Sequence, residues 1–571
     1  MATFGSGEKS GSVPECEPVD TPQPGLKNKM IPAENVNNRA WPRPNMIMIR
    51  ICRLGAMLTV VCLPFLKVVP AYAVDLPAVQ IAALDQPRVN GQLRGEPPMA
   101  PLYGIILSEA FTASLDTGSS GIVINNFRAA DLGIGHAMFN GEDVVYLDAG
   151  STGAATFTVS ELLNLEIASF EASTPVTSYP HVTGPARVQI AEPDFLFDGF
   201  DINVVGMPAM KCKFVVLDPK PTNTFTPENP YAYMNTFVYN PWTPFDAGNA
   251  ADPGIPPTSH HVRLSYADFN GFGTLTTSPS GYSPPDTLGP TLAPNPFIGP
   301  DPVTLLEGGT DDTPGITISF DGEVATGSFL LDTGAASSFI SKAMAAGLNV
   351  RYVAGTEGTA TPQLESFDPD NPGDPGVVLP GTFTTDITGV SGTQTVAGFF
   401  LDWVLLPTQE AADPYDNADS DNLKFLGGPV LVADISTTNG VDTITLEGIF
   451  GMNFISASTD PATFPSSDIV PTPFDWAVFD APGGTLGLHV AGFPYPPARV
   501  PADGDINLDG VVNAADVALA FKALLSGSGT LTDEQVAHAD VAPKGECGPI
   551  PDGAFNLGDV IVLMRMALDE D

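Results

Sequence analysis

The chain has 571 residues, with 23 lysines and arginines against 66 aspartates and glutamates, and its formal net charge is −43. A surface this acidic argues against nucleic acid or an anionic membrane as a partner. The length predicts about three or four domains, and because glycine and proline number 57 each and 43% of the residues are hydrophobic, the composition favours turn-rich β domains over helical bundles.

The N-terminal segment predicts export. Residues 1–45 are polar and irregular, so we expect them to be disordered or to precede the true start codon. Residues 46–73 have a basic start at Arg50 and Arg53, a short apolar run and a small-residue cleavage site at Ala73. The apolar run is too short to span a bilayer comfortably, so we expect no stable membrane insertion and a secreted or cell-surface protein; an N-terminal anchor is the alternative.

Changes in composition divide the rest of the chain. Residues 74–100 are expected to be a loose lead-in. Short β-type runs, then a segment rich in proline and glycine, then further β-type runs and finally an acidic helical region follow in order. The predicted boundaries are 102–218 for a first β lobe, 219–300 for an interlobe insertion, 301–492 for a second β lobe and 502–571 for the C-terminal module.

An internal repeat stands out within the two predicted lobes. The repeated strings are Leu115-Asp116-Thr117-Gly118-Ser119 and Leu331-Asp332-Thr333-Gly334-Ala335. Two carboxylates within hydrogen-bonding distance cannot both ionise, so one can take a proton from water while the other polarises a carbonyl oxygen. If instead the strings are two unrelated β-turns, they have no common chemistry, because Asp and Gly favour turns in general.

Downstream features repeat as well. An apolar pair followed by glycine ends at Gly206 in the first half and at Gly451 in the second. Each half then closes with an apolar strand that ends in an aspartate, Asp218 and Asp480 respectively. Matching contexts of this kind favour a duplicated lobe over chance.

Together these residues resemble the aspartic peptidases of the pepsin and retropepsin group, over roughly residues 102–490. The resemblance implies a mainly β, bilobal double β-barrel that hydrolyses peptide or protein substrates without a catalytic cofactor. It implies Asp116 and Asp332 as the catalytic pair, and as supporting residues Thr117, Gly118, Ser119, Thr333, Gly334, Gly206 and Gly451. The Ser119 hydroxyl is expected to hydrogen-bond Asp116, a bond that Ala335 cannot make to Asp332.

The family also covers its substrate with a hairpin that carries a tyrosine. The string from Val145 to Gly153 resembles that flap, with Tyr146 as the candidate. An ordinary strand tyrosine is the alternative interpretation.

The C-terminal module begins with an acidic loop. Oxygen-bearing residues stand at loop positions 1, 3, 5, 7 and 12, with glycine at position 6 for the sharp turn, as in the calcium loop of an EF-hand. The predicted ligands are Asp505, Asn507, Asp509, the carbonyl of Val511, and Asp516. A second, degraded loop offers Asp540, Asp552, Ala554 and Asp559, interrupted by an insertion that carries Cys547.

Two such loop–helix units at the end of a secreted chain resemble a type I dockerin. The resemblance implies Ca²⁺-dependent folding of a small α-helical, EF-hand-like module and docking to a cohesin-bearing protein. A purely structural calcium clip without a partner is the alternative. Cys212 and Cys547 lie far apart in different predicted domains, so the sequence does not indicate a disulfide framework. A bridge between these two cysteines is left open.

The sequence as a whole thus predicts a secreted aspartic endopeptidase that a calcium module tethers. The alternative is a catalytically inactive, protease-like surface protein that binds peptides or proteins through its lobes.

Overall fold

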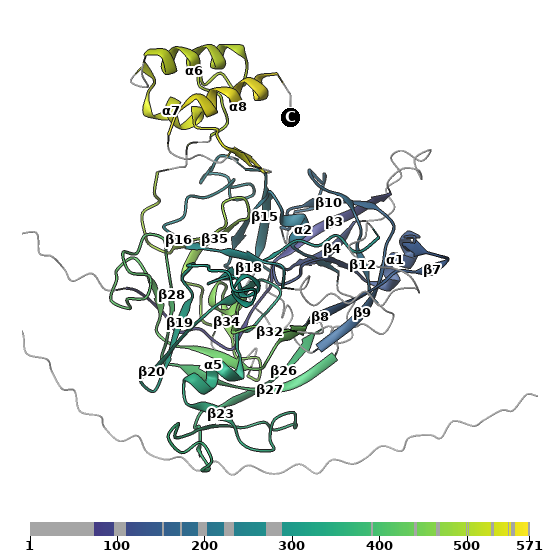
Figure 1. Ribbon diagram of the computed structural model, residues 1–571, viewed down its shortest axis with the longest axis vertical. Coiled ribbons are helices and arrows are strands. Elements are labelled where there is room, and N and C mark those ends of the chain that lie inside the picture. Colours follow the sequence, from purple (N-terminus) through teal and green to yellow (C-terminus); the bar gives the residue numbers. More distant parts are fainter. Residues whose placement is uncertain are drawn as a thin grey trace, which may run out of the picture. The chain divides into compact units, whose positions relative to one another are not determined.

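The fold is mainly β, and its two longest helices lie at the C-terminal end of the chain (Figure 1). The computed structural model describes residues 73–95, 110–150, 153–171, 174–191, 203–221, 233–241, 243–269, 288–389, 392–438, 442–463, 469–497, 500, 502–526, 530–545, 547–549 and 554–568. The predicted start and signal segments, 1–45 and 46–73, lie outside the described residues apart from Ala73.

The first lobe is built on a nine-stranded sheet with the order β11-β10-β3-β4-β13-β5-β12-β9-β8. Its strands are β3 (Arg88–Gly95), β4 (Phe111–Leu115), β5 (Ile122–Ile124), β8 (Val145–Gly150), β9 (Gly153–Val159), β10 (Leu163–Ala168), β11 (His181–Ala186), β12 (Gln189–Ile190) and β13 (Val204–Val205). The short helices α1 (Asn126–Leu132) and α2 (Met207–Met210) and the small hairpin β6 (Met138–Phe139)–β7 (Glu142–Asp143) complete this part.

The expected loose lead-in at 74–100 is wrong. Its strand β3 lies inside the first sheet, between β10 and β4, and its side chains Val89 and Leu93 are fully buried. The preceding strands β1 (Val74–Leu76) and β2 (Ala82–Ala83) pair with β29 and β34 of the second lobe. The chain therefore enters the fold well before residue 102.

The second lobe repeats the arrangement in an eight-stranded sheet with the order β17-β18-β21-β33-β22-β30-β27-β26. Its strands are β17 (Ser265–Ala267), β18 (Asn295–Ile298), β21 (Phe329–Asp332), β22 (Phe339–Ile340), β26 (Phe383–Gly389), β27 (Gly392–Leu401), β30 (Gly428–Val432) and β33 (Gly448–Gly451). Strand by strand, from β4 and β21 outward, parallel and antiparallel pairs alternate in the same way in both sheets.

Smaller sheets flank the second lobe. They comprise β19 (Ile316–Phe320), β20 (Glu323–Gly327), β28 (Trp403–Leu406) and β29 (Leu423–Phe425); β23 (Val350–Tyr352), β24 (Leu364–Ser366) and β25 (Val377–Val378); β31 (Ser436–Thr438) and β32 (Thr443–Thr445); and β34 (Ser458–Thr459). The helices α4 (Pro302–Leu306), α5 (Lys342–Gly347) and η2 (Met452–Phe454) connect them.

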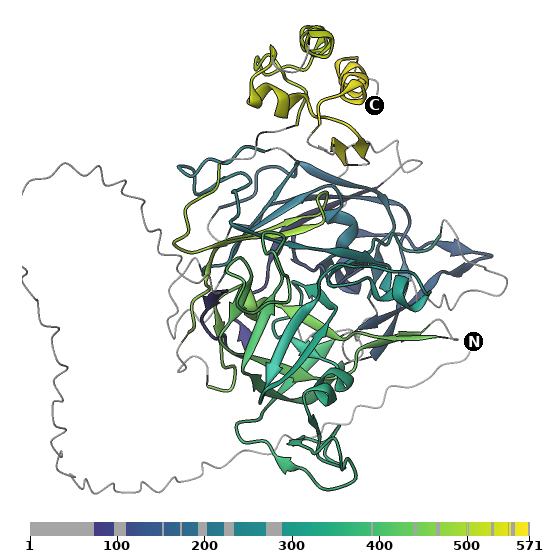
Figure 2. The same ribbon diagram turned by 60° about the vertical axis from the view of Figure 1, so that its left-hand side comes forward.

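A five-stranded sheet joins the lobes, with the order β15-β14-β35-β36-β16. Its strands are β14 (Phe214–Asp218), β15 (Asn235–Tyr239), β16 (His260–Arg263), β35 (Phe474–Asp480) and β36 (Thr485–Val490). The two closing strands of the repeat, β14 and β35, pair with each other antiparallel at its centre. The view in Figure 2 shows these strands from a second side.

The segment 219–300 is therefore more than an insertion. Its residues supply β15 and β16 to the interlobe sheet and β17 and β18 to the second lobe. All four residues of β18 are buried, and Phe297 and Ile298 have no exposed surface. Burial of these side chains stabilises the segment against the second lobe, which thus begins before residue 301.

The C-terminal module folds around its own small core. It contains α6 (Ala514–Ser526), α7 (Asp533–Ala539), α8 (Leu557–Ala567) and the two-residue strands β37 (Lys544–Gly545) and β38 (Gly548–Pro549). Ile506, Ala520, Val560 and Leu563 are fully buried between the helices. In the described part of the chain, no helix combines the length and the apolar character that crossing a membrane requires.

Candidate active site

The two Asp-Thr-Gly turns occupy equivalent places at the ends of β4 and β21. Beside each turn runs a parallel strand: β13 pairs with β4, and β33 pairs with β21. Gly206 and Gly451 follow in these neighbouring strands, where a Cβ atom would collide with backbone carbonyls of the adjacent turn, those of Ser119 and Gly121 at Gly206 and those of Ala335 and Ser337 at Gly451. Only glycine fits such a close backbone approach.

The threonines of the two turns interlock. Thr117 Oγ1 accepts the backbone N–H of Thr333 at 3.0 Å, and Thr333 Oγ1 accepts the N–H of Thr117 at the same distance. Both side chains are buried, so these bonds hold without competition from water. The two halves of the repeat therefore meet at their acidic turns.

The carboxyl groups of Asp116 and Asp332 hydrogen-bond each other. A Cβ atom at Gly118 would collide with the Asp332 carboxyl, and a Cβ atom at Gly334 would collide with that of Asp116. Each glycine thus leaves room for the carboxyl group of the other lobe. Both aspartates are half-buried, so water reaches the pair.

Burial raises the pKa of both carboxyl groups. For Asp332 the neighbouring charge of Asp116 adds to burial, and its pKa lies well above the ordinary value. For Asp116 the hydrogen bond from Asp332 and the N–H groups of the turns oppose the effect of burial. A pair of this kind keeps one proton at a pH where isolated carboxylates have lost theirs.

The expected bond from the Ser119 hydroxyl to Asp116 is wrong. Ser119 Oγ donates instead to the carbonyl of Gly121 at 3.1 Å. The carboxylates accept backbone N–H groups: Gly118 donates to Asp116 at 2.8 Å, and Gly334 and Ala335 donate to Asp332 at 2.8 and 3.0 Å. The turn backbone, rather than the serine, orients the acidic groups.

Sequence reasoning missed two amide side chains at the turns. Asn295, the first residue of β18, donates its Nδ2 to the carbonyl of Thr117 at 3.0 Å and accepts the Ser120 hydroxyl at 2.5 Å. Gln86, before β3, donates its Nε2 to the carbonyl of Gly334. Both lie in segments predicted as lead-in or insertion, and no motif marks either of them.

The flap candidate lies in a hairpin, as expected, but its side chain is buried. Strands β8 and β9 pair antiparallel, and Tyr146 is 1% exposed in a cluster with Val144 and Val159. This burial fits the alternative, an ordinary strand tyrosine, better than a side chain that covers substrate. The second lobe has an equivalent hairpin, β26–β27, at the corresponding edge of its sheet.

The backbone of the first acidic loop of the C-terminal module folds around its own carboxylates, as in a cation-binding loop. Gly510 has a φ of 85° at the sharp turn, and its N–H donates to the Asp505 carboxylate at 2.6 Å. Asp516, fully buried, accepts the N–H groups of Asn507 and Asn513. The donors Asp505, Asn507, Asp509, Asp516 and the Val511 carbonyl are all oxygens, the kind that Ca²⁺ prefers. Among described residues, no three His, Cys, Asp or Glu side chains form a metal site by themselves.

The second loop keeps the same frame. Asp559, at position 12, is fully buried and accepts the N–H of Ala542 at 2.8 Å and that of Asn556 at 2.6 Å. These donors stand two residues after Asp540 and three residues before Asp559, the offsets that Asn507 and Asn513 have in the first loop. Ala554 is described and exposed, whereas Asp552 lies outside the described residues.

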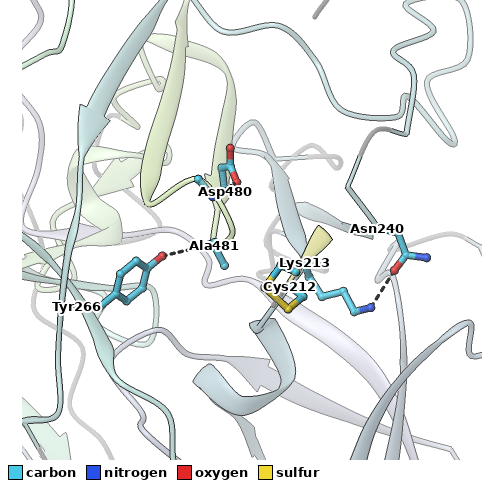
Figure 3. The surroundings of a disulfide bond; sticks show 8 residues. Cys212, Lys213, Asn240, Tyr266, Asp480 and Ala481 are labelled. Atoms are coloured by element: carbon cyan, nitrogen blue, oxygen red, sulfur yellow. Dashed lines mark hydrogen bonds between the residues drawn. A yellow bond between two sulfur atoms is a disulfide. The ribbon is translucent and has the colours of Figure 1, made fainter. Parts of the chain in front are cut away.

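A disulfide joins Cys212 to Cys547, with the Cα atoms 4.8 Å apart (Figure 3). Cys212 follows α2, and Cys547 stands between β37 and β38 in the insertion of the second loop. Next to it, Lys213 donates to the side chain of Asn240 at 2.8 Å. The bridge left open by the sequence is therefore formed.

Residues 503–546 match the family model of the Dockerin type I domain. The C-terminal module is a type I dockerin. The match ends inside the second loop of the dockerin, just before Cys547. No curated protein is similar enough to match the chain.

Solved structures with some likeness to the chain include the crystal structure of edgp, at 10% identity and a TM-score of 0.28, over 71% of this chain and 94% of that one. An aspartic proteinase from Irpex lacteus has 12% identity and a TM-score of 0.27, over 72% and 97%. Both TM-scores are low. The bilobal arrangement is therefore described from the chain's own repeated strand order and its paired Asp-Thr-Gly turns.

Proposed function

We propose that the two lobes form a secreted aspartic endopeptidase and that the dockerin tethers it, in a Ca²⁺-dependent way, to a cohesin-bearing protein. The observation that carries the catalytic part is the hydrogen bond between the carboxyl groups of Asp116 and Asp332. The raised pKa of Asp332 supports a pair that shares one proton, the state that acid–base hydrolysis needs.

In this proposal Asp332 holds the shared proton at rest and Asp116 is ionised. Asp116 takes a proton from water as the water oxygen attacks the peptide carbonyl carbon, while Asp332 gives its proton to the carbonyl oxygen. The tetrahedral intermediate then collapses: the C–N bond breaks, the amine nitrogen takes the proton from Asp116, and the hydroxyl proton returns to Asp332. Backbone N–H groups of the turns stabilise whichever carboxylate is charged.

Features outside the catalytic pair support the proposed tethering and secretion. Type I dockerins bind calcium in general and typically bind cohesins, and both loops here keep the hydrogen-bond frame around position 12. A disulfide between distant segments supports an oxidising compartment. Cleavage after Ala73 would leave β1 intact, since that strand begins at Val74.

The test is a digest of a mixed peptide library by the purified full-length protein from acid to neutral pH, read by mass spectrometry. Asp116→Asn and Asp332→Asn are expected to abolish cleavage while leaving the fold intact. Asp312→Asn is the matched control, because the Asp312 side chain is 96% exposed and should be dispensable. Full activity of the Asp332→Asn variant would overturn the mechanism.

The alternative, an inactive binding protein, has a distinct outcome. Peptides that bind the wild-type lobes and stay uncut at every pH would support it. Tethering is tested separately by capture on an immobilised cohesin with calcium and with chelator. Capture that is equal in both would contradict the calcium-dependent tether.

A further inference from the structure

Each catalytic turn is held by a side-chain amide from the other lobe. Asn295 belongs to the sheet of the second lobe and donates to the Thr117 carbonyl in the turn of the first lobe at 3.0 Å. Gln86 precedes β3 in the first lobe and donates to the Gly334 carbonyl in the turn of the second. The two contacts therefore cross the interface in opposite directions.

The two amides occupy the same position in the repeat. Arg88 pairs with Ser114, two residues before Asp116, and Phe297 pairs with Leu330, two residues before Asp332. Gln86 and Asn295 each stand two residues before the strand residue of that pair. Equivalent positions with the same type of donor indicate a repeated feature and not a chance contact.

Each amide bonds to a peptide unit that itself bonds to a catalytic carboxylate. The carbonyl of Thr117 and the N–H of Gly118 form one peptide unit, and that N–H donates to Asp116 Oδ1 at 2.8 Å. In the second turn the peptide unit lies one residue further along: it consists of the carbonyl of Gly334 and the N–H of Ala335, and this N–H donates to Asp332 Oδ1 at 3.0 Å. A hydrogen bond to a peptide carbonyl polarises the whole unit and strengthens the donation from its N–H.

We propose that Asn295 and Gln86 are positioning residues that act on the acidity of the Asp116–Asp332 pair through these two peptide units, an inference that rests on the proposed function. Asn295 suits the task because it is fully buried and both ends of its amide are engaged, the oxygen by Ser120 at 2.5 Å. The titratable group that faces each carboxyl is the other carboxyl of the pair, and the remaining groups that bear on them are backbone N–H groups of the turns.

The pH–rate profile of the full-length protein tests this. Asn295→Ala and Gln86→Met remove the donors, so the N–H groups stabilise the charged carboxylates less and the acid limb should move to higher pH. We expect a loss of kcat/KM about twofold larger on the acid side of the profile than at its maximum, with the double variant showing more. Gln86 is partly exposed, which lets Gln86→Met fold even where Asn295→Ala folds poorly.

Asn422→Ala is the matched control. Asn422 is fully buried and bonds the backbone of residues 408, 413 and 416, away from the turns. This variant should lose stability while its pH–rate profile keeps its shape. If the profiles of Asn295→Ala and Gln86→Met also fell by one factor at every pH, the two amides would be merely structural and the proposal would be overturned.

A second measurement needs no turnover and separates the two proposals. Weaker stabilisation of the folded carboxylates makes Asn295→Ala lose more stability near neutral pH than near pH 3, by about twofold or more in the unfolding constant. Asn422→Ala should lose the same amount at both. If the wild-type protein cleaves nothing but the two variants differ in this way, only the peptidase proposal is refuted. If Asn295→Ala, like Asn422→Ala, loses the same stability at both pH values, the proposed role of the amides is refuted.

Discussion

Thr117 and Thr333 each place one hydroxyl oxygen between a donor and an acceptor of the opposite lobe. Thr117 Oγ1 accepts the Thr333 N–H at 3.0 Å and donates to the carbonyl of Leu331 at 2.5 Å. Thr333 Oγ1 accepts the Thr117 N–H at 3.0 Å and donates to the carbonyl of Leu115 at 2.7 Å. The carbonyls belong to the residues just before the aspartates, so the same bonds that join the lobes fix the carboxyl groups.

Thr333→Val should therefore weaken both the fold and the activity. The valine keeps the shape but leaves the Thr117 N–H and the Leu115 carbonyl buried without partners, at a cost of about 2 kcal/mol or more. Urea denaturation and peptide cleavage measure the two effects. Thr333→Ser retains the hydroxyl and is the control; equal losses in both variants would contradict the role of the hydroxyl.

Gly334→Ala should abolish cleavage. Its Cβ atom would meet the Asp116 carboxyl, so the pair has to separate, and we expect kcat/KM to fall by about 100-fold or more, the size of effect that small displacements of reacting groups produce. Gly347→Ala is the matched control, because the nearest atom to its Cβ would be 3.9 Å away, in Ala325. Near-normal cleavage by Gly334→Ala would show that the described carboxyl geometry is not the active one.

Asp332→Asn should change how stability depends on pH. Burial and the charge of Asp116 raise the pKa of Asp332 in the folded protein, so the unfolded chain releases this proton at lower pH than the folded one. The contribution of the Asp332 carboxyl to the free energy of unfolding is thus fully present at low pH, and it is lost as the pH rises through the pKa of the folded state. Asparagine does not titrate, so the stability of the variant relative to wild type should increase from about pH 3 to about pH 6.

Urea denaturation followed by tryptophan fluorescence measures this difference, because Trp403 lies in a sheet beside the second lobe and Trp476 lies in the sheet that joins the lobes. Asp312→Asn, at an exposed carboxyl, should show no such increase. A constant difference between wild type and Asp332→Asn at all pH values would mean that the carboxyl titrates normally.

Removal of calcium should unfold the dockerin and leave the two lobes folded. Chelation leaves the buried carboxylate of Asp516 without its cation, and α6 loses the loop that starts it. Asp516→Ala should lower calcium affinity by at least about tenfold, measured by calorimetry on the full chain. Asp533→Asn, in the exposed first turn of α7, is the control and should bind normally. Undiminished affinity in Asp516→Ala would remove it from the site.

Local patterns predicted much of this molecule. The Asp-Thr-Gly turns, the two later glycines and the first calcium loop are each specified within a few residues, so spacing and residue type were enough to find them. The lobes meet at Thr117 and Thr333, two of the residues that the resemblance named as supporting the catalytic pair.

Contacts between residues far apart in the chain could not be predicted from the sequence. Asn295 lies 178 residues from Thr117, and its position between prolines gave no periodic signal. Strand β3 was missed although Val89 and Leu93 alternate, because its glycines and arginines read as a loop. The bond from Ser119 to Asp116 was predicted from the resemblance, whereas the Ser119 hydroxyl donates to the Gly121 carbonyl.

Cys212 and Cys547 are 335 positions apart, and their bond closes a covalent ring that includes the eight-stranded sheet of the second lobe. A single break in the backbone inside that ring opens it without separating its ends. A peptidase that cut its own chain between the second lobe and the dockerin would accordingly stay attached to its anchor, and only reduction of the disulfide together with the cut would release it.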